Sequence, residues 1–226
     1  MTTILITGTN RGIGLEMANQ ALARGWTVYG SARAAVTDPD AHICHHPKFH
    51  DLQFDVTDHA AVRAAAASVS EPIDILINNA GSIGPERQST LDMDFDGFAQ
   101  TFAVNTLAPL AVVQAFLPHL KRSSSPRILT ISSRMGSLSH QKSDRIAYRA
   151  SKAAVNKVMQ GLATDLEPMG VAVAVLHPGW VRTDMGGAGA DIAPAESAAG
   201  ILKLAEGLTL AGTSKFYNWD GSSLDW

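Results

Sequence analysis

The feature that most constrains the fold of this chain is a regular alternation along its length. Short β-branched apolar runs alternate with longer segments that are rich in alanine and leucine and have a helical period. A repeated strand, helix, strand order is typical of a parallel sheet covered by helices. The runs are nearly continuous in apolar character, as expected of strands buried on both faces. The sequence therefore predicts an α/β fold, a single doubly wound parallel sheet with helices on both faces.

The alternation also predicts where the elements lie. We expect about seven strands, at 4–7, 27–32, 51–55, 73–78, 127–132, 172–177 and 215–219. We expect helices between them, at 12–23, 60–69, 95–121, 148–166 and 195–204. The chain has 226 residues and contains no linker, internal repeat or low-complexity segment, so residues 1–226 are expected to form a single domain.

Charge and cysteine content exclude several classes of function. The chain has 18 basic and 21 acidic residues, a formal net charge of −3, so no strong overall field attracts nucleic acid or an anionic membrane. Cys44 is the single cysteine, which excludes an intramolecular disulfide. The first residues lack the features of a signal peptide, and no uncharged apolar stretch approaches the ~18 residues of a membrane span. We therefore expect a cytoplasmic protein that binds neither nucleic acid nor membrane.

A glycine-rich segment from Thr7 to Gly14 lies where the first strand should turn into the first helix. The glycines Gly8, Gly12 and Gly14 allow backbone to approach a pyrophosphate, and the N–H groups and dipole of the helix N-terminus attract its negative charge. The spacing differs from the commoner Gly-x-Gly-x-x-Gly pattern, and a tight structural turn is the alternative interpretation. The segment predicts a dinucleotide site.

The end of the second predicted strand favours a phosphorylated dinucleotide. An NAD site expects a carboxylate there, about 20 residues after the glycines, to hold the ribose 2′-hydroxyl. This chain has Arg33 at that place and no acid until Asp38, and a second cation, Arg11, stands just before Gly12. Guanidinium groups form charge-assisted, forked hydrogen bonds with phosphate. Together the two arginines predict NADP(H) rather than NAD(H), although either one alone would be interpreted as a solvated surface charge.

A second signal is Tyr148, four residues before Lys152 at the start of a predicted helix. This spacing puts the two side chains one turn apart on one face, so they can converge on the same small molecule. A tyrosine has an ordinary pKa of about 10, and a nearby ammonium shielded from water stabilises the phenolate. The pair therefore predicts that Tyr148 acts as a general acid and base. The same spacing also occurs by chance on many solvated helix faces.

Motifs along essentially the whole chain resemble those of the short-chain dehydrogenase/reductase family, and within it the NADP-dependent carbonyl reductase branch. They are, in order, the turn TGTNRGIG from Thr7, Asp55-Val56, Asn78-Asn79-Ala80-Gly81, Asn105, Ile131-Ser132-Ser133, Tyr148 with Lys152, and His177-Pro178-Gly179-Trp180-Val181-Arg182-Thr183. The resemblance implies a Rossmann-type sheet and an NADP(H)-dependent oxidoreductase acting on a small carbonyl or alcohol.

The resemblance also implies a role for each matching residue. The residues implied to hold the cofactor are Gly8, Asn10, Arg11, Gly12, Ile13, Gly14, Arg33, Asp55, Val56, Asn79, Ala80, Gly81, Tyr148, Lys152, Pro178, Gly179, Val181 and Thr183. Those implied to be catalytic are Asn105, Ser133, Tyr148 and Lys152. Ser133 would hydrogen-bond the substrate oxygen, and Asn105 would fix a water that links Lys152 to solvent. Because the stretch between the serines and Tyr148 is longer than usual in the family, Ser132 stays open as the alternative to Ser133.

We therefore expect NADPH-dependent reduction of a ketone or aldehyde, reversible as alcohol oxidation, in which hydride comes from the nicotinamide and Tyr148 supplies the proton. An NADP-binding regulatory or sensor protein is the alternative, and a methyltransferase on a similar sheet predicts no tyrosine and lysine pair at this place. The segment after Gly179 is short and rich in glycine, which implies an open, permissive pocket. The candidates for its apolar wall are Met185, Trp180, Met135 and Leu138.

Three further features have simpler explanations than a function. The cluster of His42, Cys44, His45, His46 and His50 matches no tetrahedral zinc spacing, so we expect a surface loop and no metal. Ser133, His140 and Asp144 lack the Gly-x-Ser-x-Gly elbow of a hydrolase. The apolar faces of the helices at 95–121 and 148–166 are expected to be core, and the family habit of pairing these helices across a two-fold axis allows a homodimer.

Overall fold

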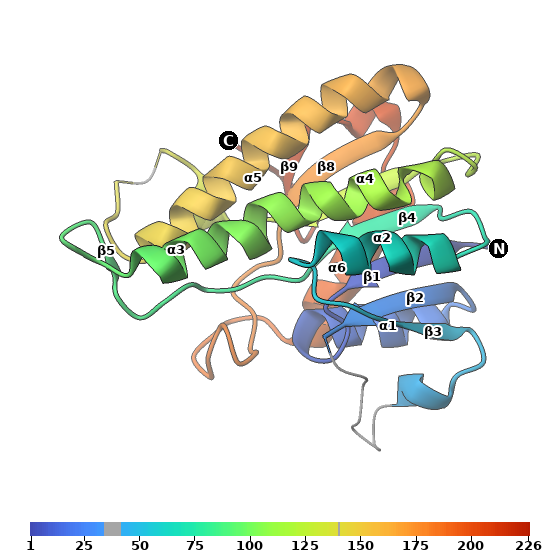
Figure 1. Ribbon diagram of the computed structural model, residues 1–226, viewed down its shortest axis with the longest axis horizontal. Coiled ribbons are helices and arrows are strands. Elements are labelled where there is room, and N and C mark those ends of the chain that lie inside the picture. The colour runs from blue at the N-terminus through green and yellow to red at the C-terminus, as the bar shows by residue number, and fades with distance from the viewer. Residues whose placement is uncertain (34–41, 140) are drawn as a thin grey trace.

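The computed structural model describes residues 1–33, 42–139 and 141–226, and these form one eight-stranded sheet with helices on both faces (Figure 1). The sheet order is β10-β9-β8-β7-β4-β1-β2-β3. Its strands are β1 Thr3–Thr7, β2 Thr27–Ala32, β3 Phe49–Gln53, β4 Ile75–Asn78, β7 Arg127–Ile131, β8 Ala172–His177, β9 Lys215–Asn218 and β10 Ser223–Leu224. All neighbouring pairs in this sheet are parallel except β9 with β10. The predicted doubly wound α/β fold is confirmed, and the strand beyond the expected seven is the short antiparallel edge β10.

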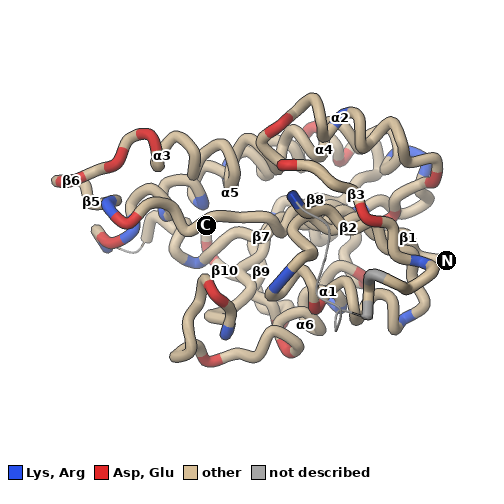
Figure 2. The backbone as a smooth tube through the Cα atoms, turned by 60° about the horizontal axis from the view of Figure 1, so that its bottom comes forward, with Lys and Arg blue, Asp and Glu red and all other residues tan. Residues whose placement is uncertain are grey.

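Two helical layers enclose the sheet, as Figure 2 shows. The helices α1 Gly12–Ala23 and α6 Pro194–Gly207 pack against each other and against one face. The helices α2 His59–Ser68, α4 Ala108–Leu120 and α5 Ile146–Leu166 cover the opposite face. Within the central strands, alternate side chains enter the two layers: Ile4 and Ile6 of β1 face α1 and α6, whereas Leu5 faces the other side. This period of two explains why the central strands are apolar at every position.

The predicted helix at 95–121 is one continuous helical stretch that changes geometry in its middle. It consists of α3 Phe95–Phe102, a π-helical turn Ala103–Leu107 and α4. The stretch Phe95–Leu120 is 26 residues long and contains an 18-residue window with a mean hydropathy of 1.4, so by length and composition alone it could cross a membrane, contrary to the expectation that no segment approaches this. Its apolar side chains Val112, Val113 and Phe116 are buried in the core against the sheet.

The strand order reverses beside β1, which lies between β2 and β4. In open parallel sheets, ligands bind at such a reversal, outside the carboxyl ends of the strands. The loops that follow β1, β4, β7 and β8 all leave this edge.

β3 is shifted from the predicted 51–55 to Phe49–Gln53, because its register with β2 pairs Phe49 with Val28. Asp55 and Val56 therefore lie in the loop beyond the strand rather than at its end. A separate two-stranded hairpin, β5 Gln88–Ser89 with β6 Asp92–Met93, was not predicted.

Candidate active site

The turn after β1 is built around glycines that no other residue could replace without strain. Gly8 and Gly12 have φ values of +76° and +57°, which L-residues rarely adopt. A Cβ atom on Gly14 would lie 2.0 Å from the carbonyl oxygen of Gly8, so the first turn of α1 sits directly on this loop. The N–H groups of Gly8 and Thr9 both donate to the Ser31 carbonyl at the end of β2. Among residues 1–33, 42–139 and 141–226, no side chain caps α1, and no acidic residue lies in its first turn, which leaves its N–H groups open to an anion.

Asn79 joins this turn to the loop after β4. Its side-chain Nδ2 donates to the carbonyl oxygens of Thr7 and Gly8 at 2.9 and 3.1 Å. In return, the backbone N–H groups of Asn79 and Ala80 donate to Thr7 Oγ1 at 3.0 and 3.1 Å. These four hydrogen bonds hold the ends of β1 and β4 in a fixed relation. The loop 79–81 is therefore a rigid wall of the crevice.

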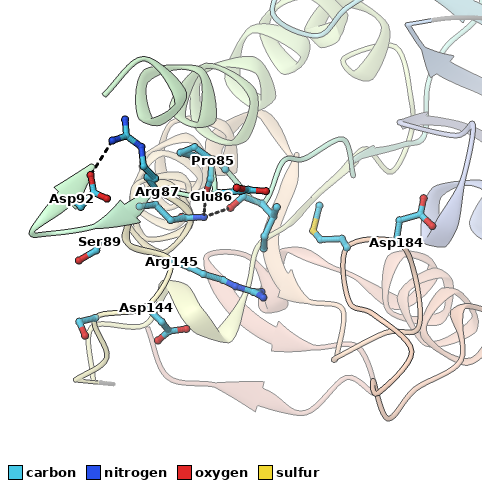
Figure 3. A pocket seen from close by; sticks show the side chains of 13 residues that line it. Pro85, Glu86, Arg87, Ser89, Asp92, Asp144, Arg145 and Asp184 are labelled. Atoms are coloured by element: carbon cyan, nitrogen blue, oxygen red, sulfur yellow. Dashed lines mark hydrogen bonds and ion pairs between the residues drawn. The ribbon is translucent and has the colours of Figure 1, made fainter. Parts of the chain in front are cut away.

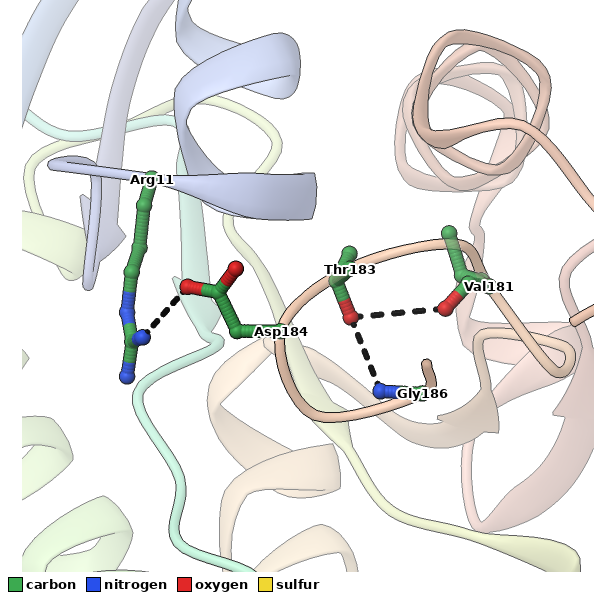
Figure 4. A network of polar contacts seen from close by, with 5 residues as sticks. All are labelled: Arg11, Val181, Thr183, Asp184 and Gly186. Atoms are coloured by element: carbon green, nitrogen blue, oxygen red, sulfur yellow. Dashed lines mark hydrogen bonds and ion pairs between the residues drawn. The ribbon is translucent and has the colours of Figure 1, made fainter. Parts of the chain in front are cut away.

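The segment after β8 lies against the glycine turn, and Figure 4 shows contacts within it. Thr183 lies against the glycine turn, because a Cβ on Gly12 would be 3.4 Å from Thr183 Cγ2. The Thr183 hydroxyl accepts from the N–H of Gly186 at 3.2 Å and donates to the Val181 carbonyl at 3.3 Å, which closes a compact loop. Earlier in the same segment, the Pro178 carbonyl accepts from Ser197 Oγ at 2.6 Å. The segment 178–183 thus lies between the glycine turn and the start of α6.

The two arginines predicted to bind a 2′-phosphate lie in different surroundings. Arg11 pairs with Asp184 at 2.7 Å across the crevice, and the side chains are 65% and 77% exposed (Figure 4). An exposed pair of this kind contributes at most about 1 kcal/mol. Arg33 stands at the end of β2, where its charge helps to lower the pKa of Asp55, after the larger effect of hydrogen bonding from Thr57. Arg33 and Asp55 are therefore neighbours at the expected adenosine end of the crevice.

Tyr148 and Lys152 both point from the first turns of α5 into the protein. They are only 8% and 4% exposed, and the Lys152 Nζ lies 5.7 Å from the centre of the Tyr148 ring. The Nζ donates to the Ile131 carbonyl at the end of β7, at 2.7 Å. Burial lowers the pKa of Lys152 from 10.5 to about 8. The predicted convergence of the two side chains is thus observed, and at neutral pH most of the amine stays protonated.

The phenol of Tyr148 differs from the prediction. Burial raises its pKa above the ordinary value of 10.0, whereas hydrogen bonding with Ser133 and the charge of Arg145 act in the opposite direction. We expected the ammonium of Lys152 to help lower this pKa, but in the protein chain by itself the pKa is raised, because desolvation of the phenol is the largest effect. Any lowering has to come from further positive charge or hydrogen bonding at the site.

The structure distinguishes the two adjacent serines. Ser132 Oγ is buried and donates to Asn156 Oδ1, so it faces the body of α5. The side chain of Ser133 lies close enough to Tyr148 to lower the phenol pKa by hydrogen bonding, and its Oγ also accepts from the N–H of Met135 at 3.1 Å. Of the two residues left open by the sequence, Ser133 is the one beside the phenol.

Asn105 lies in the π-helical turn, a geometry that is often found at functional sites. Its Oδ1 accepts from the N–H of Ser82 at 2.8 Å, and its Nδ2 donates to the Ser82 carbonyl at 2.8 Å and to Ser151 Oγ at 2.9 Å. A Cβ on Gly81 would lie 3.4 Å from Asn105 Oδ1 and 3.8 Å from Lys152 Nζ. Asn105 therefore ties the loop after β4 to α5, directly beside the lysine.

The geometry agrees with the results of comparison with known proteins. A family model described as short chain dehydrogenase matches residues 2–191. The chain belongs to this family. C-signal from Myxococcus xanthus is 40% identical over 167 residues, which are 73% of this chain and 100% of that protein. NADPH-bound carbonyl reductase from chicken fatty liver has a TM-score of 0.92 and 32% identity, covering 100% of this chain and 99% of that chain. Carbonyl reductase Sniffer of D. melanogaster has a TM-score of 0.92 and 29% identity, covering 100% of both chains.

In this short-chain dehydrogenase, a cavity of about 540 Å³ opens beside the start of α5 (Figure 3). It is lined by residues 83–89, Asp92, residues 143–145, Asp184 and Met185. Of the four apolar residues expected in the pocket wall, only Met185 lines this cavity; Trp180 and Leu138 are largely exposed. The residues that sequence reasoning missed are Gln88 and Arg145. The position of Arg145, three residues before Tyr148 at a helix start, was a usable signal, but nothing local marks Gln88.

The features with simpler explanations show no site in the described part of the chain. Asp144 pairs with Arg149 at 2.7 Å, and His140 lies outside the described residues. His50 stacks on Tyr29 at 4.7 Å, and His46 Nδ1 accepts from the N–H of Lys48. The side chains of His42 and Cys44 lie outside the described residues. Among residues 1–33, 42–139 and 141–226, no group of three or more His, Cys, Asp or Glu side chains could hold a metal ion.

Proposed function

We propose that this chain reduces a ketone or aldehyde with NADPH, and oxidises the alcohol in the reverse direction, with Tyr148 as the general acid and base. The observation that carries the proposal is the convergence of Tyr148, Ser133 and the buried amine of Lys152 at the end of β7. Membership of the short-chain dehydrogenase family and likeness to carbonyl reductases over the whole chain support the same reaction.

The crevice fits a dinucleotide on structural grounds. The glycine turn exposes backbone N–H groups at the start of α1 and has no space for a side chain at Gly14. The Ser31 hydroxyl at the end of β2 is buried without a hydrogen-bond partner among the described residues. In the described part of the chain, Lys152 Nζ has a single acceptor, the Ile131 carbonyl, so its other N–H groups are available to ribose hydroxyls. Arg33 at the end of β2 favours the 2′-phosphate of NADP(H), the cofactor of the chicken carbonyl reductase.

When bound, the reduced nicotinamide supplies the hydride for the carbonyl carbon. As the carbonyl oxygen gains the electron pair, the phenol of Tyr148 donates its proton to that oxygen, so no uncompensated negative charge forms. Ser133 orients the same oxygen through its hydroxyl. The amine of Lys152, with a pKa of about 8, stabilises the phenolate that remains. Asn105, which holds the loop beside Lys152, is proposed to position a water for proton return.

The open, mixed cavity favours small carbonyl compounds rather than a single bulky substrate. The alternative is a protein that binds NADP(H) and signals without turnover. The name of the relative C-signal supports testing this alternative. The cytoplasm is the proposed compartment, and a homodimer across α4 and α5 stays a prediction.

The proposal is tested by mixing the protein with NADPH and a panel of aldehydes and ketones while the absorbance of the reduced cofactor is followed. We expect Tyr148→Phe to lower turnover by roughly 10²–10⁴-fold, the contribution of a positioned acid, and to leave NADPH binding nearly unchanged. Tyr217→Phe is the matched control, because its hydroxyl donates to the Gly212 carbonyl and lies in β9, away from α5. Normal turnover by Tyr148→Phe would contradict the assignment, and tight NADPH binding without oxidation by any carbonyl would favour the signalling protein.

A further inference from the structure

The helix α5, which carries Tyr148, begins without the usual side-chain cap. The residue before it, Arg145, has a φ of +51°, and its side chain makes no capping hydrogen bond. The first helical hydrogen bond runs from the N–H of Arg149 to the Arg145 carbonyl. The N–H of Tyr148 is therefore the last of the backbone donors that have no partner inside the helix. In ordinary helices, a side chain at the residue before the helix accepts from this N–H.

Here the acceptor comes from a distant part of the chain. Gln88 Oε1 accepts from the N–H of Tyr148 at 3.1 Å, across 60 positions of sequence. The Gln88 side chain is 7% exposed, so water does not compete strongly for this hydrogen bond. It extends from the small hairpin of β5 and β6 outside the main sheet. Gln88 thus replaces the missing cap at the residue proposed to donate the proton.

The other end of the same amide holds the loop that lines the cavity. Gln88 Nε2 donates to the carbonyl oxygens of Ile83 and Pro85 at 3.0 and 2.7 Å. Between them, Gly84 has a φ of +87°, and a Cβ there would lie 3.2 Å from Gln88 Oε1, so the loop folds closely over the amide. Ile83 and Pro85 both line the cavity, and Pro85 is labelled in Figure 3. Both donors and the acceptor of Gln88 are used in this arrangement.

We propose that Gln88 is a positioning residue that fixes the phenol of Tyr148 relative to the substrate-side loop 83–85. The inference rests on the proposed function. Its amide connects the start of the catalytic helix to the wall of the cavity, so the acid and the substrate-binding surface move as one unit. Displacement by about 1 Å of a reacting group can lower a rate by 10²-fold, which makes such a connection important for turnover.

Two substitutions separate the two ends of the amide. Gln88→Met keeps the length and removes all three hydrogen bonds, and we expect kcat to fall by about 10–100-fold. Gln88→Glu keeps an acceptor for the N–H of Tyr148 but places oxygen against the carbonyls of Ile83 and Pro85. We expect this variant to raise KM for the carbonyl by about 10-fold with a smaller change in kcat, since it mainly releases the loop.

The matched control is Thr213→Val, which also removes side-chain hydrogen bonds to backbone. Thr213 Oγ1 accepts from the N–H of Val173 at 2.9 Å, near the start of β8. This is the amino end of the strand, opposite the carboxyl ends where the candidate site lies. A merely structural role for Gln88 would make Gln88→Met resemble Thr213→Val, with a lower melting temperature and unchanged kcat and KM. That result would overturn the proposal.

Amide hydrogen exchange provides a readout that does not need turnover. We expect the amide of Tyr148 to exchange at least about 10-fold faster in Gln88→Met, and to stay protected in Gln88→Glu. Unchanged exchange in Gln88→Met would show that the hydrogen bond does not fix the helix start. If Tyr148→Phe retains normal turnover, the proposed function fails, and the exchange rates still decide whether Gln88 holds the start of α5.

Discussion

Replacing Lys152 by methionine is expected to make this protein more stable while it loses activity. The two side chains have similar length, but methionine has no charge to bury. Burial lowers the pKa of Lys152 from 10.5 to about 8, which corresponds to roughly 3 kcal/mol of unfavourable charge burial at neutral pH. The substitution also leaves the Ile131 carbonyl without its donor, which costs about 1–3 kcal/mol.

The net gain in the free energy of unfolding at pH 7 is therefore up to about 2 kcal/mol. For a domain of this size, each kcal/mol raises the melting temperature by about 2–4 °C. Turnover should fall by roughly 10²–10⁴-fold, because the phenolate of Tyr148 loses the neighbouring ammonium. Burying the charged amine lowers the stability of the folded protein. We therefore expect that Lys152 is kept for the reaction rather than for stability.

The sign of the pH dependence provides the sharper test. Below about pH 8, Lys152 is charged in both states and the folded protein bears the full cost of burying the charge. Between about pH 8 and 10.5, the unfolded chain binds a proton that the folded chain has released, so the stability of the wild type rises with pH. The variant lacks this contribution. Its advantage over the wild type should therefore shrink as the pH is raised from 7 to 9.5.

The measurement is urea unfolding of the cofactor-free protein at pH 7 and pH 9.5 at constant ionic strength. Lys157→Met is the control on the same helix, because Lys157 is exposed and its Nζ donates only to Gln160 Oε1 among the described residues. We expect this control to stay within about 0.5 kcal/mol of the wild type at both pH values. A Lys152→Met variant that is less stable at pH 7, or that differs from the wild type equally at both pH values, would refute the reasoning.

Four other substitutions test separate parts of the site. Arg33→Asp should weaken NADPH binding by about 10–100-fold and shift preference toward NADH, measured by titration with each cofactor; an unchanged preference would mean that Arg33 does not meet the phosphate. Gly14→Ala should lower the melting temperature and weaken NADPH binding by at least about 10-fold, because its Cβ would lie 2.0 Å from the Gly8 carbonyl oxygen. Ser133→Ala should lower kcat with little loss of stability, whereas Ser132→Ala should lower the free energy of unfolding by about 1–3 kcal/mol, as checked by kinetics and urea unfolding; the reverse pattern would exchange their roles.

Much of the framework could be predicted because it depends on local patterns. The central strands were recognisable from continuous apolar runs, since each buries side chains on two faces. The glycine turn was recognisable because Gly8 and Gly12 adopt backbone conformations that favour glycine. Tyr148 and Lys152 were placed on one face by the helical period alone. In each case the physical cause acts within a few residues.

Other features depend on partners that are distant in sequence. β3 was expected two residues too late, because its hydrogen-bonding register with β2 decides where it begins. The pair β5 and β6 was missed because strands of two residues have no detectable period. The raised pKa of Tyr148 depends on complete burial, which follows from tertiary packing and not from the neighbouring ammonium that the sequence shows.

The same distinction explains how the site is assembled. The local sequence supplies the chemical groups, but their relative positions depend on three side-chain amides that bind distant backbone. Asn79 joins the ends of β1 and β4, Asn105 joins the loop after β4 to α5, and Gln88 joins that loop to Tyr148. An amide can donate and accept at once, so each one links two segments without adding charge to a site that already buries the amine of Lys152. Neutral connections of this kind leave the electrostatics of the phenol to its burial, to Ser133 and to the charge of Arg145.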